Sequence, residues 1–337
     1  MLSMTVMYRL AACTLFVALA PGQPWAQRAP APPEPVFVET FVNEPATLSA
    51  LLGRWSISGA LDRSVWDLRI RTVVDPLGKT VGRITVQEGD ARDGVAEAAR
   101  LAQPYVCDST GSRAAEIEAG PIGFPPTERA EIQIRSERAT GIGELVKFGA
   151  PVWYRFSFKI GGDWPRDVPA AGRTPCRTVI HQVKQDSSRD GQSCRACPFL
   201  KIEARPLGER VLFYAQLSSG APCAVPPKVQ RVKICVVDDL VREVWTPVNV
   251  RLLPTQDSSG RADLWLNGRH CGTYRGPMGD REHGERRNGL PIVNAQPRFG
   301  IYRDWRAETQ TIYFDRIMFW NADPTGHADW GVGAPPS

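Results

Sequence analysis

The feature that most constrains this fold is a series of short strand-like runs with almost no helical periodicity between them. Each run is rich in β-branched and aromatic residues, and Gly, Pro, Asn or Asp separate it from the next. The runs are Val65–Val74, Val81–Gln87, Arg129–Arg135, Val152–Ile160, Thr178–Val183, Phe199–Ala204, Arg210–Gln216, Val248–Leu253, Ala262–Leu266, Arg298–Tyr302 and Gln310–Phe319. Asn267–Gly268 predicts a two-residue hairpin turn, and only Gly94–Ala102 looks helical. The pattern predicts an all-β antiparallel sandwich or jelly roll.

Length and charge narrow the class of protein. The chain has 337 residues, 42% hydrophobic and 23% charged, which is ordinary globular usage. One β-sandwich of roughly 200 to 250 residues with a processed N-terminus accounts for this length. The net charge is +5, from 41 basic and 36 acidic residues, so we expect no nucleic-acid partner.

The N-terminus has the layout of a secretory signal peptide, over residues 1–26. Arg9 precedes a short apolar run, and small residues surround the expected cleavage site near Ala26. The run is too short to span a bilayer, and Cys13 lies inside it, unlike a lipoprotein cysteine. A retained N-terminal anchor is the alternative. We expect a secreted or periplasmic protein without membrane contact after signal removal.

The rest of the chain divides into three expected segments. Residues 27–36 are rich in Pro and Ala and predict an extended linker. Residues 37–323 are expected to form a single β-jelly-roll domain, and residues 324–337 a flexible tail that ends in Gly and Pro. We expect this protein to be a monomer.

Seven cysteines remain after removal of Cys13 with the signal. In an oxidising compartment they predict about three disulfides and one leftover thiol, whose connectivity the sequence leaves open. Cys194 and Cys197 form a CxxC motif, which leaves a redox or zinc site as alternatives. No second CxxC or paired histidine follows, and no Asp/Asn-rich calcium loop stands out. We therefore expect structural disulfides, no cofactor and no metal site, while the sequence leaves a structural calcium open.

Alternation along the strands predicts which polar side chains share a face. Arg129, Glu131, Gln133 and Arg135 are expected to lie together, opposite an apolar set. The same rule places four outward side chains on the run Val152–Ile160; these are Trp153, Arg155, Ser157 and Lys159. Arg, Gln, Lys, Trp and Tyr on one face suit an acidic sugar, because such sites need aromatic platforms and cations.

Two further runs add candidates to that face. Alternation puts Gln182 and Lys184 on the polar side with Ile180, and His181 on the apolar side, unless a β-bulge intervenes. Tyr302 shares its face with Gly300, and a glycine beside a tyrosine leaves room for a ligand. The alternative is that these polar strand faces are simply solvated.

Six segments, in this order, carry a resemblance to a known family. They are ERAEIQIR, VWYRFSFKIGGDWP, VIHQVKQ, DLWLNG, RFGIYR and TIYFDRI, and they cover most of Val65–Phe319. In this order they resemble the heparin lyase I and glucuronan lyase-like polysaccharide lyases. The resemblance implies a concanavalin A-like jelly roll and a lyase that cleaves an acidic, uronic-acid-containing polysaccharide by β-elimination.

The resemblance also implies roles for individual residues. Arg129 and Gln182 match the residues that neutralise the sugar carboxylate, and Tyr302 matches the proton donor and a candidate base. Related sequences carry histidine where Lys184 stands, and lysine, with a pKa of about 10.4, is a poor base at neutral pH. Three possibilities for the proton transfers therefore stay open. Tyr302 makes both transfers, Lys184 only neutralises charge, or His181 reaches the site through a β-bulge. The residues expected to bind substrate are Glu131, Gln133, Arg135, Trp153, Arg155, Lys159 and Arg303.

Two other functions compete with the lyase. A non-catalytic jelly-roll module would bind an acidic glycan on the same face without cleaving it, and the lysine at position 184 keeps that alternative open. A glycoside hydrolase would need two carboxylates about 5 to 9.5 Å apart, and no paired-acid strand is visible.

Overall fold

The computed structural model describes residues 31–41, 55–58, 63–90, 107, 127–134, 145–169, 171, 176–185, 198–221, 228–280 and 294–333. Residues from Pro32 onward form one compact unit. The helix expected at Gly94–Ala102, the CxxC motif, Cys223 and Arg135 lie outside the described residues.

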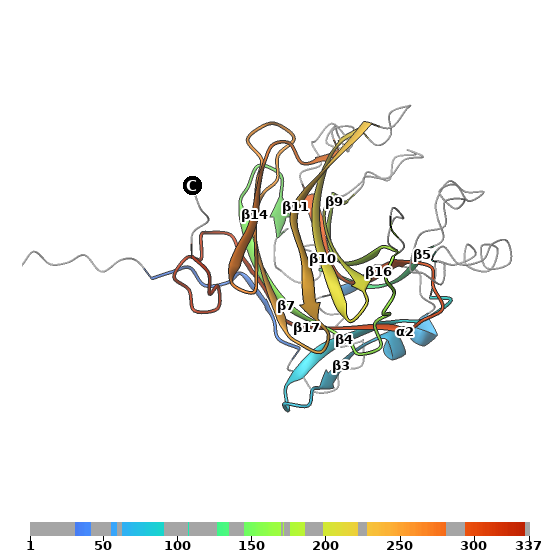
Figure 1. Cartoon of the computed structure of the whole chain (residues 1–337). Coiled ribbons are helices and arrows are strands. Elements are labelled where there is room, and N and C mark those ends of the chain that lie inside the picture. Colours follow the sequence, from blue (N-terminus) through green and yellow to red (C-terminus); the bar gives the residue numbers. More distant parts are fainter. Residues whose placement is uncertain are drawn as a thin grey trace, which may run out of the picture. The chain divides into compact units, whose positions relative to one another are not determined.

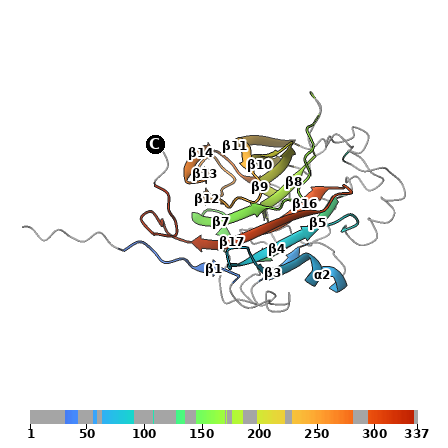
Figure 2. The ribbon, with the colours of Figure 1, turned by 60° about the horizontal axis from the view of Figure 1, so that its bottom comes forward.

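One sheet, here called the back sheet, runs in the order β14-β13-β12-β7-β17-β4-β3, with β1 paired to β17. Figure 1 shows it beside the second sheet, and Figure 2 labels its strands in this order. All of its described pairs are antiparallel. Its strands are β1 (Phe37–Glu39), β3 (Ile70–Val74), β4 (Thr80–Val86), β7 (Val152–Ile160), β12 (Thr246–Leu253), β13 (Arg261–Leu266), β14 (Arg269–Arg275) and β17 (Gln310–Trp320).

The second sheet, the front sheet, runs in the order β11-β10-β9-β8-β16-β5-β2 (Figure 2). Two short strands join it, β6 beside β16 and β15 beside β10, the latter in parallel. Its strands are β2 (Trp55–Ser58), β5 (Thr127–Ile134), β6 (Val146–Lys147), β8 (Thr178–Gln185), β9 (Pro198–Leu207), β10 (Arg210–Ala221), β11 (Lys228–Val241), β15 (Gly279–Asp280) and β16 (Asn294–Asp304).

The two sheets pack face to face over one apolar core, so the predicted all-β sandwich of the jelly-roll kind is confirmed. The alternation on β7 holds as predicted, because Val152, Tyr154, Phe156, Phe158 and Ile160 all face the core. Rings from the two sheets meet there: Phe156 of β7 lies 5.2 Å from Phe299 of β16, centroid to centroid.

Three local predictions have different outcomes. The Asn267–Gly268 hairpin is confirmed, since both residues have positive φ, 52° and 77°, as a type I′ turn requires. The strand expected from Val65 is wrong over its first half: Arg63–Arg69 forms helix α2, in which Leu68 is 57% exposed, and the strand begins only at Ile70. The sequence missed β11, because its apolar and polar residues do not alternate strictly.

The described part of the expected tail, residues 324–333, is packed and not loose. Trp330 is 1% exposed and joins Trp153, Trp265, Met318 and Trp320 in a cluster on the outer face of the back sheet. Asn249 of β12 donates a hydrogen bond of 2.7 Å to the Trp330 carbonyl. The burial of one tryptophan therefore fixes this segment, which its Gly and Pro content did not indicate.

Two disulfides lie within the described residues, Cys107–Cys176 and Cys235–Cys271. The second joins β11 to β14, which are the edge strands of the front and back sheets. It therefore ties the two sheets together at one side of the sandwich. No helix in the described part of the chain is long and apolar enough to cross a membrane.

Candidate active site

The outer face of the front sheet is a polar surface, here called the floor. Side chains that face each other across paired strands lie on the same side of a sheet, and the register forms two rows. The first row is Arg129, Tyr302, Val179, Glu203 and Tyr214. The second row is Gln133, Arg298, Gln182, Lys201, Gln216 and Lys233. In the second row, amides and cations therefore alternate across six strands.

Tyr302 of β16 is the second residue of the first row, between Arg129 and Val179. Two guanidinium groups flank its ring. The Cζ of Arg129 lies 4.3 Å from the ring centroid, and the Cζ of Arg177 lies 4.9 Å from it. Burial opposes ionisation of Tyr302, but the charges of Arg177 and Arg129 outweigh it, and the net pKa is lowered from 10.0. The arrangement favours the phenolate, which is the form that accepts a proton.

Arg177 was not predicted, because it precedes the strand run whose faces were assigned. Asp304, two residues after Tyr302, holds Arg177 in place. The backbone N–H of Arg177 donates to Asp304 Oδ2 at 2.7 Å, and the guanidinium Nη2 of Arg177 lies 3.1 Å from Asp304 Oδ1. The Asp304 N–H donates in return to the Arg177 carbonyl at 3.0 Å. Cys176, the residue before Arg177, forms a disulfide with Cys107. The guanidinium therefore has a fixed position beside the tyrosine.

Glu131 links the tyrosine to the second row. It is 1% exposed, accepts a hydrogen bond of 2.5 Å from Gln182 Nε2, and lies 3.5 Å from Arg129 Nε. An amide nitrogen carries two N–H bonds, so Gln182 keeps one for a ligand. The carboxylate orients both of the groups that the sequence predicted to neutralise an acidic sugar.

A family model identifies the family to which this chain belongs. A model of the family described as "Polysaccharide lyase" matches residues 64–318, which is most of the chain. This chain belongs to the polysaccharide lyase family. It is therefore an enzyme, a carbon–oxygen lyase that acts on polysaccharides. No curated protein matches it.

Solved structures resemble the lyase only distantly. The endo-β-1,4-glucuronan lyase from the fungus Trichoderma reesei is 12% identical, with a TM-score of 0.47, covering 85% of this chain and 95% of that one. The alginate lyase A1-II′, a member of polysaccharide lyase family 7, is 10% identical, with a TM-score of 0.45, over 80% of this chain and 95% of that one. The alginate lyase Aly36B is 10% identical, with a TM-score of 0.42, over 84% and 95%.

His181 does not reach the floor of the lyase. Its side chain is fully buried in the core, where Nε2 lies 2.9 Å from the Tyr154 hydroxyl and Nδ1 lies 2.8 Å from the Arg298 carbonyl. Burial lowers the pKa of His181 to about 3. A register shift does occur between Val179 and His181, but it moves Ile180 into the core instead of moving the histidine out. The expectation that Ile180 faces the floor is therefore wrong.

Lys184 lies on the floor, but far from the tyrosine. Its register partner is Gln296, six positions before Tyr302 on the same strand. At about 3.3 Å a residue, the two rows are roughly 20 Å apart. Gln182 stands one row closer and leans toward Glu131. The register therefore separates Lys184 from Tyr302.

Three residues expected to bind substrate belong to the other sheet. Trp153, Arg155 and Lys159 lie on the outer face of the back sheet, because their strand, β7, is paired with β12 and β17. Arg155 donates to the Asp329 carbonyl, and Lys159 lies 4.7 Å from the Tyr313 ring centroid. Alternation identified the outward face of β7 correctly, but it does not say to which sheet a strand belongs.

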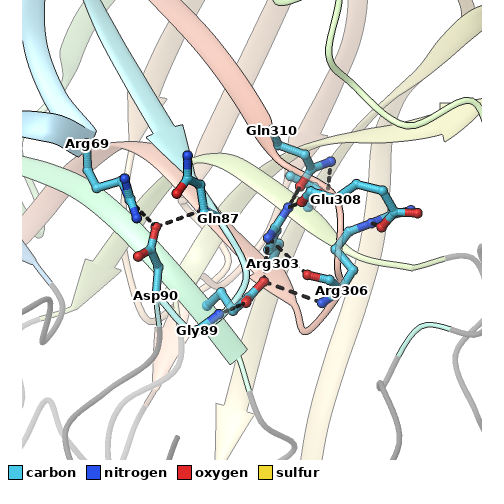
Figure 3. Close-up of polar contacts among 10 residues, drawn as sticks. Arg69, Gln87, Gly89, Asp90, Arg303, Arg306, Glu308 and Gln310 are labelled. Carbon is cyan, nitrogen blue, oxygen red and sulfur yellow. Dashed lines mark hydrogen bonds and ion pairs between the residues drawn. The ribbon is translucent and has the colours of Figure 1, made fainter. Parts of the chain in front are cut away.

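Arg303 is also absent from the floor, because it points the opposite way from Tyr302. It is fully buried and forms an ion pair with Glu128, with Nη2 2.6 Å and Nε 2.7 Å from Oε2. Gly89 donates to the other Glu128 oxygen at 2.8 Å, and Gln310 accepts from Arg303 at 3.2 Å (Figure 3). This network anchors the end of β16 that carries Tyr302.

The remaining predicted substrate residues, Glu131 and Gln133, are on the floor. Among the described residues, no group of three or more His, Cys, Asp or Glu is placed to hold a metal ion. The absence of a cofactor stays a prediction.

Proposed function

We propose that this lyase cleaves its acidic polysaccharide at Tyr302, with Arg129 and Gln182 holding the carboxylate of the uronate whose C5 proton is removed. The observation that carries the proposal is the position of Tyr302 between two guanidinium groups, 4.3 and 4.9 Å from its ring. A tyrosine in that field is a stronger acid than usual, so its phenolate forms closer to neutral pH.

The carboxylate comes first. In the elimination, negative charge develops on the carboxyl group as the C5–H bond breaks, and hydrogen-bond donors aimed at that group stabilise it. The Arg129 side chain is 30% exposed and offers guanidinium N–H groups, and Gln182 offers the N–H that Glu131 leaves unused. Glu131 thus positions both donors without contacting the sugar itself.

The proton transfers follow. The Tyr302 phenolate takes the C5 proton, the C–H electron pair becomes the C4–C5 double bond, and the C4–O bond breaks. The phenol that has formed then gives its proton to the departing glycosidic oxygen, so atoms and charge balance. One residue makes both transfers, because His181 is in the core and Lys184 lies roughly 20 Å along the strands from the Tyr302 row.

The protein's location and assembly belong to the proposal as well. Buried cystine links and an N-terminal segment of the signal type support export to the periplasm or the medium. We propose that the mature lyase works as a monomer, without a membrane anchor and without a cofactor. Its partner is the acidic polysaccharide.

The test is a substrate panel with a matched pair of variants. Glucuronan, alginate and heparin-type glycans are offered to the mature protein, and the ultraviolet absorbance of the C4–C5 unsaturated uronate is followed. We expect signal with at least one of them, and Tyr302→Phe should abolish it while leaving binding intact. Tyr313→Phe, on the back sheet, is the control and should keep full activity. Binding without product in the unmodified protein would instead support the non-catalytic module.

A further inference from the structure

A second tyrosine on the floor repeats the arrangement around Tyr302. Tyr214 of β10 lies in the same cross-strand row, and the Cζ of Arg205 is 4.5 Å from its ring centroid. The Nζ of Lys233, from the neighbouring strand β11, is 5.6 Å from the same centroid. Tyr214 is therefore a half-buried aromatic ring with two cations close to it, three strands away from Tyr302.

The chemistry of this second cluster differs from that of the first. Burial raises the pKa of Tyr214, although Arg205 opposes this, whereas the pKa of Tyr302 is lowered. The pKa values of the two phenols are therefore shifted in opposite directions, and Tyr214 is the weaker acid of the two. Its hydroxyl donates to Gln216 Oε1 at 3.2 Å. The cluster has the groups needed to bind an acidic sugar and lacks a base to cleave it.

Gln216 adds an unused donor to the cluster. It is 7% exposed, and its Nε2 has no hydrogen-bond partner within the described part of the chain. A buried N–H without a partner costs about 1–3 kcal/mol, so a site that leaves one open is poised to donate it to a ligand. Exposed Val236 extends the same row beyond Tyr214 and adds apolar surface for a sugar ring.

The spacing suits a polymer that crosses the strands. From Tyr302 the row passes through Val179 and Glu203 to Tyr214, which is three strand spacings. At about 4.8 Å each, the two tyrosines stand roughly 14 Å apart. A polysaccharide placed across Tyr302 would lay a later sugar residue over Tyr214, beside the cations of Arg205 and Lys233. Arg205 is held in place by Glu203, whose Oε2 lies 2.6 Å from Arg205 Nη2.

We infer that Tyr214, Arg205, Lys233 and Gln216 form a distal binding subsite for an acidic sugar residue of the same polysaccharide chain, beyond the bond that is cleaved. This inference rests on the proposed function, because it takes Tyr302 as the place of cleavage. The subsite makes the lyase prefer long substrates, since only these reach both tyrosines at once.

The experiment compares the cleavage of trimers and octamers of β-1,4-linked glucuronate, with the mannuronate oligomers in parallel. A contact of this type is worth a factor of about 5 to 30. We expect Tyr214→Ala and Lys233→Gln to lower kcat/KM for the octamer by that factor and to leave the trimer value within about twofold. Tyr313→Ala is the matched control, because Lys159 lies 4.7 Å from its ring centroid on the back sheet. It should change neither value.

Failure of the subsite and failure of the cleavage proposal give different results. An octamer that the unmodified lyase cleaves no better than the trimer, or octamer cleavage that survives Tyr214→Ala unchanged, would overturn the subsite and leave Tyr302 in place. Octamer binding to the Tyr302→Phe protein is measured as well, by calorimetry. If Tyr302→Phe stays active while Tyr214→Ala still weakens octamer binding, the distal subsite stands and the assignment of Tyr302 falls.

Discussion

Replacement of Arg177 by glutamine tests the electrostatics of the proposed site. The guanidinium lies 4.9 Å from the Tyr302 ring centroid and is one of the two charges that lower the pKa of the phenol. The other charged groups acting on this phenol are Arg129 and Glu131 of β5, while Asp304 and Glu203 of β9 act through Arg177. Glutamine keeps polar atoms at the position and removes only the positive charge.

The magnitude follows from Coulomb's law. Two unit charges 4.9 Å apart interact by about 3.4 kcal/mol at an effective dielectric of 20 and by about 0.8 kcal/mol in bulk water. One pKa unit corresponds to about 1.36 kcal/mol, so the loss of Arg177 should raise the pKa of Tyr302 by about 0.6 to 2.5 units. Because the base is the phenolate, a higher pKa means less active enzyme at any pH below it.

The assay is the pH profile of kcat/KM on the best substrate of the panel. In the unmodified lyase the rate should rise with pH and level off above the pKa of Tyr302, which lies below 10.0. In Arg177→Gln this rising limb should move to higher pH by about 0.6 to 2.5 units, which lowers the rate at neutral pH by about 4- to 300-fold. Arg177→Lys keeps the charge and should move the limb much less.

The control is Arg251→Gln. Arg251 also places its guanidinium over an aromatic ring, 5.7 Å from the Trp153 ring centroid, but on the back sheet. Thermal unfolding of each variant separates a loss of rate from a loss of fold, since Arg177→Gln leaves the buried Asp304 without its guanidinium. An unmoved limb in a folded Arg177→Gln protein would refute the reasoning, because the phenol would then not depend on that charge.

Three stability predictions follow from the fold. Arg303→Leu should cost about 3 to 5 kcal/mol in chemical unfolding, because it leaves the fully buried Glu128 without its partner; an effect under 1 kcal/mol would show that the pair is not desolvated. Trp330→Ala should cost about 3 to 5 kcal/mol by the same measurement, since the ring is 1% exposed, whereas a loose tail would tolerate it. Replacing both Cys235 and Cys271 by serine opens a loop spanning 36 positions and should cost about 4 kcal/mol; a protein as stable as the disulfide form would contradict this.

Local alternation predicted most of the fold and part of the site. It assigned both faces of β7 correctly, and it put Arg129, Glu131, Gln182 and Tyr302 on one floor, because each of these lies in a regular stretch of strand. Alternation depends only on the next residue along the chain. It needs no knowledge of the partner strand, and where the backbone stays regular it is sufficient.

The errors at the site come from information that is not local. The register shift after Val179 moved Ile180 to the core, and bulges leave no clear trace in a single sequence. Strand β7 entered the back sheet, so Trp153 and Lys159 face away from the floor. Arg177 lies outside any strand and acts only because Asp304 and the cystine at Cys176 hold it beside the tyrosine.

Lys184 stood where the family resemblance led us to expect a histidine, and its basicity put the reaction in doubt. Its distance from the Tyr302 row removes it from the proton transfer and leaves the tyrosine without a second base. A tyrosine that works alone must ionise more readily, and two guanidinium groups meet that need by electrostatics. In the proposed mechanism the charge of Arg177 lowers the pKa of Tyr302, so that the tyrosine itself takes the place of a histidine base, which is why the charge of Arg177, and not that of Lys184, should control the pH profile.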